Sequence, residues 1–308
     1  MSTQANAPRA SFRLSASAIQ MFLECRQKYL LERMLKVGPA MRQLALDFGA
    51  AIDGAVRVLY EKNWDLKAAK ETFRMLYKED ASDTKRTYAV GELMIERYVQ
   101  AYRNQGLEIV SQGFPFVLEV DGFGMPVEIV GEIDRVVRQA GRTMPSEMKT
   151  TSQLTADYMK KFWVDVQTGI YLVAAKELID PAISAVHIDA LLVAKSDPSK
   201  LKSAPLLRDI VEHDAEELAY MAMRIRQIIG AMIDAITQYE SGANDLFYEN
   251  DQACTNYGGC KYLQYCRRSP KVRASIMQTE FVRYEQDSAR FAMFDNARRG
   301  KFRVQTGK

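Results

Sequence analysis

Three short groups of residues along the chain carry side chains that could hydrolyse a phosphodiester. In chain order they are Gly131–Asp134, Glu147–Lys149 and the pair Gln167 and Tyr171. Such a reaction needs a divalent cation that offsets phosphate charge and acidifies a bound water, and a group that orients this water. Two carboxylates and a lysine are sufficient for this chemistry. The groups therefore indicate a metal-dependent nuclease site.

Each side chain can be given an expected role in this site. Mg²⁺ and Mn²⁺ are hard cations that prefer oxygen ligands. We expect the carboxylates of Asp134 and Glu147 to bind the cation, with the Met148 carbonyl as a further candidate ligand. Lys149 would position or deprotonate the water. The alternative is that these carboxylates lie on an ordinary solvated face, as most carboxylates do.

Two adjacent strands are predicted to bring the acidic residues together. The segment 127–138 alternates, so that Glu128, Glu132 and Asp134 share the face opposite to an apolar face. A turn at 139–142, which contains Gly141, would reverse the chain so that 143–150 runs back alongside. Glu147 and Lys149 then lie on one face of the second strand.

A helix is predicted from Thr155 to about Ile179, because apolar residues recur there at helical spacing. Gln167 and Tyr171 are four residues apart and therefore lie on one side of this helix. Without further information, a tyrosine at such a position belongs more often to the core than to a site.

The order of these residues resembles the RecB-like branch of the PD-(D/E)XK nucleases. Members carry a strand aspartate, then Asp/Glu-x-Lys, then a helix with Gln-xxx-Tyr, which correspond here to Asp134, Glu147 to Lys149, and Gln167 with Tyr171. The resemblance implies an α/β fold with a restriction-endonuclease-like αβββαβ core and a mixed sheet. It also implies that Gln167 and Tyr171 assist at the active site and contact DNA.

One position departs from the family pattern. Family members usually carry a metal-binding histidine in a helix before the sheet, and the matching stretch Phe48–Gly54 has Asp53 at that position. Aspartate can bind the same hard cation through oxygen. We therefore treat Asp53 as a candidate metal ligand, with ordinary helix-surface charge as the alternative. His187 and His213, the two histidines of the chain, follow the catalytic helix and are interpreted as structural.

The cysteines provide a second, independent pattern. Cys25 stands alone near the start, whereas Cys254, Cys260 and Cys266 cluster near the end. The polar N-terminus gives no sign of a secretory signal, so we expect a cytoplasmic protein, in which grouped thiols indicate metal. Five residues separate each downstream pair, which is wider than structural zinc usually shows and more acceptable to an iron-sulfur cluster. Buried apolar thiols and a four-cysteine zinc site remain the alternatives.

This arrangement resembles the iron-sulfur subset of RecB-like nucleases. The subset includes AddB-type helicase-nucleases and CRISPR adaptation exonucleases. Its members place one cysteine before the nuclease core and three after it, which implies a 4Fe-4S cluster on all four cysteines. The chain departs from the commonest spacing, which has two residues between the second and third cysteines. We also expect Ser17 to cap a helix that carries Cys25, and Gly258 with Gly259 to bend the cysteine loop.

The chain of 308 residues is long enough for one elaborated domain or two. We predict a helical region at 1–110, of which 1–10 is disordered, a nuclease core at 111–242 and a cysteine loop with a basic tail at 243–308. Residues 267–308 hold 11 Lys and Arg against 4 Asp and Glu, which could attract phosphate charge or be merely solvated. Helices are expected at about 17–36, 44–63, 65–80, 84–105 and 214–240, and strands at about 114–120, 126–138, 143–150, 185–193 and 205–212.

The predicted function is a metal-dependent DNA nuclease. The residues imply metal-assisted phosphodiester cleavage, while the resemblance implies DNA as substrate, in single strands or at ends, and an exonuclease in DNA recombination, repair or processing. The alternative is a DNA-binding or assembly protein whose nuclease site is degenerate at Asp53. A membrane association is not expected, since no apolar stretch is long enough to span a bilayer.

Overall fold

A computed structural model describes residues 12–40, 43–155, 157–193, 205–243, 245–255, 259–284, 294 and 297–304. The disorder predicted for 1–10 lies outside these ranges. By its packing, the chain forms two units: one comprises Met1–Met41, Pro115–Gly131 and Glu216–Lys308, and the other comprises Arg42–Phe114 and Glu132–Ala215. We call them unit 1 and unit 2. Each is assembled from separated segments, whereas the three predicted domains are consecutive and stay a prediction.

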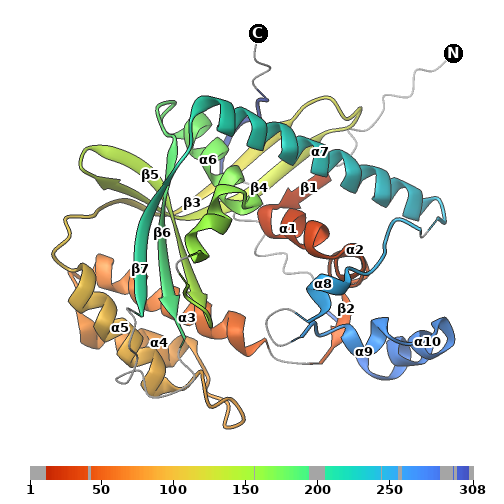
Figure 1. The fold of residues 1–308 in the computed structure, drawn as a ribbon, viewed down its shortest axis with the longest axis horizontal. Helices are drawn as coiled ribbons and strands as arrows, with labels where there is room; N and C mark the ends of the chain where they lie inside the picture. Colours follow the sequence, from red (N-terminus) through yellow and green to blue (C-terminus); the bar gives the residue numbers. More distant parts are fainter. Residues whose placement is uncertain are drawn as a thin grey trace, which may run out of the picture. The chain divides into compact units, whose positions relative to one another are not determined.

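Unit 2 contains most of a mixed sheet. The described strands that contribute to it are β3 (Glu108–Val120), β4 (Val127–Gln139), β5 (Arg142–Thr151), β6 (Ala185–Leu192) and β7 (Leu206–Glu212), in the order β7-β6-β5-β4-β3 (Figure 1). Strands β4 and β5 are antiparallel, β5 and β6 are parallel, and β6 and β7 are antiparallel. The predicted fold class, an α/β protein with a mixed sheet, is confirmed.

The turn between β4 and β5 forms as the sequence predicts. Only Ala140 and Gly141 separate the two strands, and both have positive φ, 48° and 78°. Two residues with positive φ form the tight turn whose twist matches that of the flanking antiparallel strands. Register then places Arg135 opposite Ser146. This hairpin therefore fixes the position of Asp134 relative to Glu147.

Three helices of unit 2 pack with the sheet residues Met148, Leu191 and Val193 in one apolar cluster. They are α3 (Leu44–Glu61), α4 (Leu66–Leu76) and α5 (Tyr88–Tyr102). Helix α5 can approach α4 closely because Gly91 has no side chain: a Cβ there would lie 2.1 Å from the Phe73 ring. Since Met148 points into this cluster, its neighbours Glu147 and Lys149 point to the opposite face of β5.

The single helix predicted for 155–179 is wrong. The chain forms a 3₁₀ helix, η2 (Tyr158–Trp163), and then a separate α-helix, α6 (Val166–Leu178). The reason is local: the Asp165 side chain accepts a hydrogen bond from the Thr168 amide at 2.8 Å and so caps a new helix. Apolar spacing continues through the interruption, which is why periodicity alone did not reveal it.

Unit 1 contains short strands and the longest described helix. Its described elements, besides the parts of β3 and β4 that belong to it, are β1 (Phe12–Ser15), α1 (Ala16–Glu24), α2 (Arg26–Tyr29), the π-helix η1 (Leu30–Met34), β2 (Val37–Pro39), α7 (Ala215–Glu240), α8 (Asp251–Cys254), α9 (Leu263–Cys266), α10 (Pro270–Thr279), β8 (Phe281–Arg283) and β9 (Arg298–Lys301). Strand β1 pairs in parallel with β4 and β9 in parallel with β3, while β2 and β8 are antiparallel. The short strands β1, β2, β8 and β9 were not predicted.

The helix predicted for 17–36 is divided, and its start differs. Ser15, not Ser17, caps α1, because its Oγ accepts from the Ala18 amide at 3.2 Å. Cys25 does not lie within a helix but has extended backbone angles, φ −164° and ψ 112°, at the junction of α1 and α2. The cysteine therefore projects from a break in the helical backbone.

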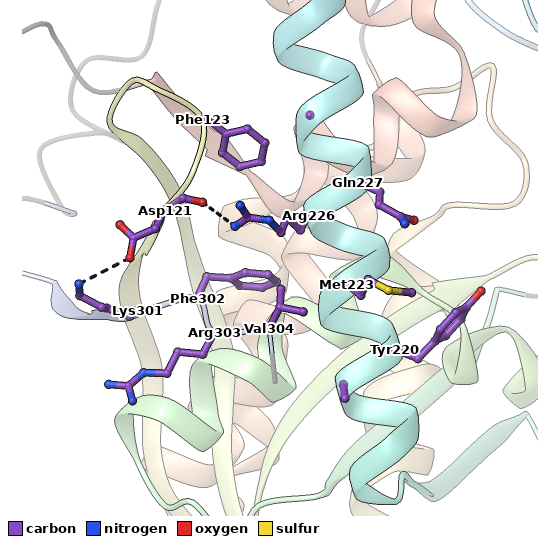
Figure 2. Close-up of a pocket in the computed structure, with 12 residues that line it drawn as sticks. Asp121, Phe123, Tyr220, Met223, Arg226, Gln227, Lys301, Phe302, Arg303 and Val304 are labelled. Carbon is purple, nitrogen blue, oxygen red and sulfur yellow. Dashed lines mark hydrogen bonds and ion pairs between the residues drawn. The ribbon is translucent and has the colours of Figure 1, made fainter. Parts of the chain in front are cut away.

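A pocket of about 1070 Å³ lies in unit 1 between the turn after β3, helix α7 and the residues after β9. Figure 2 shows Arg226 directed at the backbone of Asp121, to whose carbonyl it donates a hydrogen bond, and Lys301 on the other side, 3.6 Å from the Asp121 carboxylate. The Arg226 guanidinium also lies 4.9 Å from the centre of the Phe123 ring. Among the described residues that line this pocket, Asp121 alone is acidic. The described lining of the pocket therefore lacks the paired carboxylates that a cation site needs.

Within the described ranges, no helix combines the length and the apolar character needed to cross a bilayer.

Candidate functional site

Asp134 lies on β4 in unit 2, between the buried residues Ile133 and Arg135. Its Oδ2 accepts a hydrogen bond from the Met148 amide of β5 at 3.5 Å. Burial raises the pKa of Asp134 well above its ordinary value, and the nearby carboxylates of Glu147 and Asp53 raise it further. The charges of Arg135 and Lys149 act in the opposite direction but do not outweigh burial and the two carboxylates.

Glu147 and Lys149 form an ion pair on one face of β5. The Glu147 side chain is only 5% exposed, and burial raises its pKa even though Lys149 opposes this shift. Burial lowers the pKa of Lys149, but the Glu147 carboxylate outweighs burial, so the pKa lies above its ordinary value. The structure thus brings together the two residues that the Glu-x-Lys pattern predicted as a pair.

Helix α6 supplies Gln167 and Tyr171 to the same group of residues. The Lys149 ammonium donates a hydrogen bond to Gln167 Oε1 at 2.9 Å, and Gln167 Nε2 donates to the Tyr171 hydroxyl at 3.0 Å. The same amide nitrogen lies 3.5 Å from both carboxylate oxygens of Glu147. Burial raises the pKa of Tyr171 well above its ordinary value, which keeps the phenol neutral. Gln167 therefore connects Lys149, Glu147 and Tyr171.

Asp53 of α3 forms an ion pair with Arg135, a partner that was not predicted from the sequence. The Arg135 side chain is 2% exposed, and the Asp53 charge raises its pKa despite burial. Asp53 is still close enough to Asp134 and Glu147 for its charge to raise their pKa values. One signal of this pair was present in the sequence. Arg135 occupies a position on the apolar face of its strand, where a charged side chain needs a buried partner.

The donor set at Asp134 and Glu147 fits a hard divalent cation. Both carboxylates are buried, and their mutual repulsion would be relieved by a positive ion between them. Among the described residues, no three acidic, histidine or cysteine side chains converge closely enough to form a complete metal site. Two carboxylates are nevertheless sufficient for Mg²⁺, which usually keeps several waters as ligands.

The four cysteines all belong to unit 1. The pKa of Cys254 is raised by burial and then by the nearby Cys260 and Cys25, and burial raises the pKa of Cys266 to about 12, with smaller effects from Cys25 and Cys260. The thiols are therefore close enough to interact electrostatically. Cys25 is buried, and the three others are partly exposed.

Hydrogen bonds to backbone carbonyls hold together the two segments that carry the distant cysteines. The Gln27 amide donates to the Tyr248 carbonyl at 3.1 Å, and the Asn250 side chain donates to the Glu24 carbonyl at 2.7 Å. The Cys260 amide donates to the Cys254 carbonyl at 2.8 Å, and Gly259, the residue before Cys260, has φ 104°. Gly258, the other predicted bend residue, lies outside the described residues. Four neighbouring thiols fit a soft-metal centre, although the described cysteines do not reach ligating geometry.

Both histidines of the chain are buried. His187 is fully buried in β6 and shares a hydrogen bond of 3.0 Å with the Ser146 hydroxyl. Burial lowers its pKa to about 4, so the ring is neutral at physiological pH. His213 follows β7 and is also buried.

The chain belongs to the PD-(D/E)XK nuclease superfamily, whose sequence model matches residues 13–267. Members of this superfamily are typically metal-dependent nucleases that act on nucleic acid. No match is found among curated proteins. Among solved structures 25 chains match, one of them titled "Crystal structure of SSO0001". That protein is 15% identical, with a TM-score of 0.31, and the match covers 70% of this chain and 86% of the other.

Proposed function

We propose that this protein is a Mg²⁺- or Mn²⁺-dependent deoxyribonuclease of the RecB-like branch, acting as an exonuclease on single-stranded DNA or DNA ends. The observation that carries the proposal is the set of contacts that joins Lys149 to Glu147 and Gln167, beside the buried carboxyl of Asp134. The order of residues along the chain supports the branch and the substrate. A role in DNA recombination, repair or processing, in the cytoplasm, is part of the same proposal.

In the proposed mechanism Asp134 and Glu147 would hold the cation, with the Met148 carbonyl and Asp53 as further candidate ligands. The bound cation would stabilise charge on the scissile phosphate and acidify a water. Lys149 positions that water, and Gln167 holds the ammonium by its 2.9 Å hydrogen bond. Tyr171 supports the Gln167 amide and, as a neutral phenol, contributes no negative charge that would repel DNA.

The first prediction is that the purified protein cleaves end-labelled DNA in Mg²⁺ or Mn²⁺ and not in EDTA. Shortening from one end, in single strands or at frayed ends, would distinguish an exonuclease from an endonuclease. The measurement is product length over time on matched single-stranded and duplex substrates. Binding of DNA without cleavage in either metal would contradict the proposal.

That outcome would favour a second function, a DNA-binding or assembly protein with a degenerate site. The specific observation behind it is the ion pair between Asp53 and Arg135. The position where family members carry a metal-binding histidine is here engaged with a buried guanidinium, which competes with a cation for the same carboxylate. The cleavage assay decides between the two functions.

We also propose that Cys25, Cys254, Cys260 and Cys266 bind a 4Fe-4S cluster. The effects of Cys25 and Cys260 on the pKa values of Cys254 and Cys266 support a common centre, and the one-plus-three arrangement supports iron. Such a centre would close a loop of more than 200 residues, between Cys25 and Cys254. Because loop-closure entropy grows slowly with length, the expected stabilisation is several kcal/mol at most.

The second prediction is that anaerobically purified protein is brown and contains about four iron and four sulfide ions per chain. Cys254→Ser should lose most of the iron, because a hydroxyl is a poorer ligand for a soft site than a thiolate. The measurements are visible absorption and elemental analysis. Stoichiometric zinc without iron would contradict the cluster and support a zinc site on the same four residues.

A further inference from the structure

The segment immediately before α6 exposes a large aromatic side chain. In this segment, Tyr158–Val164, the residues Met159 and Phe162 are buried, whereas Trp163 is 58% exposed and Val164 is 60% exposed. A tryptophan usually loses most of its surface on folding, so an exposed indole is informative. The two buried residues anchor the segment and leave the indole accessible to solvent.

The exposed indole is close along the chain to the catalytic groups. Trp163 precedes Gln167 by four residues, which corresponds to at most about 14 Å of extended chain. Asp165, which lies between them, caps α6 and so fixes the start of the helix that carries Gln167. Gln167 in turn bonds to Lys149. The position of the indole is therefore tied to that of the active site.

Lys161 adds a cation to the same segment. Its ammonium lies 3.7 Å from the centre of the Tyr158 ring and 4.7 Å from that of the Phe162 ring. The pKa of Lys161 is lowered to about 8, first by burial and then by the positive charge of Lys149, although Asp165 and Glu147 oppose this shift. The ammonium is thus within electrostatic range of the catalytic pair. A phosphate bound beside the ammonium would raise this pKa, because a negative charge favours the protonated form.

The neighbouring lysine differs from Lys161. The Lys160 ammonium forms a 2.5 Å ion pair with Asp157 on the same 3₁₀ helix. Its charge is therefore compensated locally, while the Lys161 ammonium lies over aromatic rings and within electrostatic range of Lys149 and Glu147. Of these two adjacent lysines, Lys161 is the better placed for a phosphate near the active site.

We propose that Trp163 and Lys161 form a nucleotide-binding subsite for the strand being cut. An unpaired base stacks on the indole of Trp163, and the adjoining phosphate contacts the Lys161 ammonium. The inference rests on the proposed nuclease function and gives it a structural basis for selecting an unpaired strand. In a duplex both faces of each internal base are already stacked, whereas a single strand offers a free face, and stacking on an aromatic side chain contributes about 1–3 kcal/mol per base.

The third prediction uses the fact that the chain contains two tryptophans. The other, Trp64, packs on Tyr98 with ring centres 6.2 Å apart in the unit 2 core. In a Trp64→Phe variant, Trp163 is therefore the single fluorescent indole. Titration with an unlabelled oligothymidylate in EDTA, where no cleavage occurs, should quench its emission in a saturable manner. A blunt duplex at the same concentrations should leave the emission unchanged.

Substitutions in the otherwise native chain provide the matching affinity test. Trp163→Ala should weaken binding of a fluorescein-labelled single strand, measured by anisotropy, by about 5- to 150-fold, with a smaller loss for Trp163→Phe. Lys161→Met should reduce the slope of log affinity against log salt by about 0.7. Met75→Ala is the control, because Met75 is an apolar side chain of unit 2 that is 76% exposed on α4. Its binding should equal that of the parent.

The outcomes separate this inference from the function on which it rests. If the protein binds and cuts single strands but Trp163 emission and the Trp163→Ala affinity are unchanged, the subsite is refuted and the nuclease stands. Equal quenching by duplex and single strand would also refute base stacking. If the parent protein neither binds nor cuts DNA, both the nuclease function and the subsite fail.

Discussion

Glu147→Gln is expected to reduce metal-dependent DNA cleavage by at least about 100-fold, while the protein still folds. The glutamine keeps the shape of the side chain and can still bond to Gln167, which lies 3.5 Å from the carboxylate. It cannot supply the negative charge that, with Asp134, attracts a divalent cation. The measurement is the initial rate of cleavage in Mn²⁺ at equal protein concentration.

The same substitution should have little effect on stability without metal. It removes the ion pair with Lys149, whose side chain is 32% exposed, but it also removes the repulsion between two buried carboxylates. These effects oppose each other, and we expect the unfolding free energy to change by less than about 1 kcal/mol. In the parent, Mn²⁺ at 100 times its Kd should raise the unfolding free energy by about 2.7 kcal/mol. The variant should lack this increase. A variant that cleaves DNA at the parental rate would refute the role of Glu147.

Lys149→Met separates the positioning of water from the binding of metal. Methionine keeps an unbranched apolar stem but has no ammonium to donate to Gln167. Cleavage should therefore fall, while stabilisation by Mn²⁺ persists because Asp134 and Glu147 are intact. Lys176→Met, on the same helix as Gln167 but in its last turn, is the matched control and should cleave normally. Loss of metal stabilisation in the Lys149 variant would assign the lysine a different role.

The parts of this site that local patterns determine could be predicted from the sequence. Alternation along β4 and a two-residue turn at Ala140 and Gly141 are sufficient to bring Asp134 next to β5. Helical spacing of four is likewise sufficient to place Gln167 beside Tyr171, whose side chains bond at 3.0 Å. These relationships depend on residues close in sequence, so the geometry of strand and helix fixes them.

Contacts between distant residues were not predictable in the same way. Arg135 and Asp53 are 82 residues apart, and a strand pattern gives no information about which helix covers its apolar face. The parallel pairing of β1 with β4 joins residues more than 100 apart and uses a strand of four residues, too short to show a pattern. Nonlocal pairs of this kind are determined by the packing of the whole unit.

Helix interruptions were missed for a different reason. At Cys25 and Asp165 the apolar spacing continues, but a side chain accepts a hydrogen bond from an amide three residues later and starts a new helix. Such caps are single-residue features that a periodic pattern averages out. Both interruptions coincide with proposed function: one projects a cysteine, and the other sets the start of the helix that carries Gln167.

A buried polar network in unit 2 was also unforeseen, and it includes β6, the strand that pairs with β5. Asp189 lies in β6, directly opposite Met148 of β5, within a run that the sequence identifies as a buried strand. Arg208 of β7 donates to both of its carboxylate oxygens, at 2.7 and 2.9 Å, and Tyr98 donates at 2.7 Å. The Arg208 guanidinium also lies 3.7 Å from the centre of the Tyr102 ring.

Arg208→Met is expected to lower the unfolding free energy by about 3–5 kcal/mol, because it leaves the Asp189 carboxylate buried without its cation. The two side chains are 7% and 1% exposed, so water cannot replace the lost partner. Tyr98→Phe removes a single hydrogen bond from the same carboxylate and should cost about 1–3 kcal/mol. The measurement is urea unfolding at neutral pH, with the Arg208→Met and Asp189→Leu double variant as control. Because the double variant removes both buried charges, its unfolding free energy should return to near that of the parent.

The dependence on pH gives this prediction a second, independent test. Burial alone would raise the pKa of Asp189, but its hydrogen bonds to Arg208 outweigh burial and hold the pKa below its ordinary value. The folded state thus binds a proton at Asp189 less readily than the unfolded state does. The pair of Asp189 and Arg208 therefore contributes its full stability above the ordinary carboxyl pKa, and this contribution is lost as the pH falls through the lower pKa of the folded state. The difference in unfolding free energy between the parent and Arg208→Met should therefore narrow on acidification. A difference that stays constant between neutral and acid pH would show that Arg208 acts through packing and not through its charge.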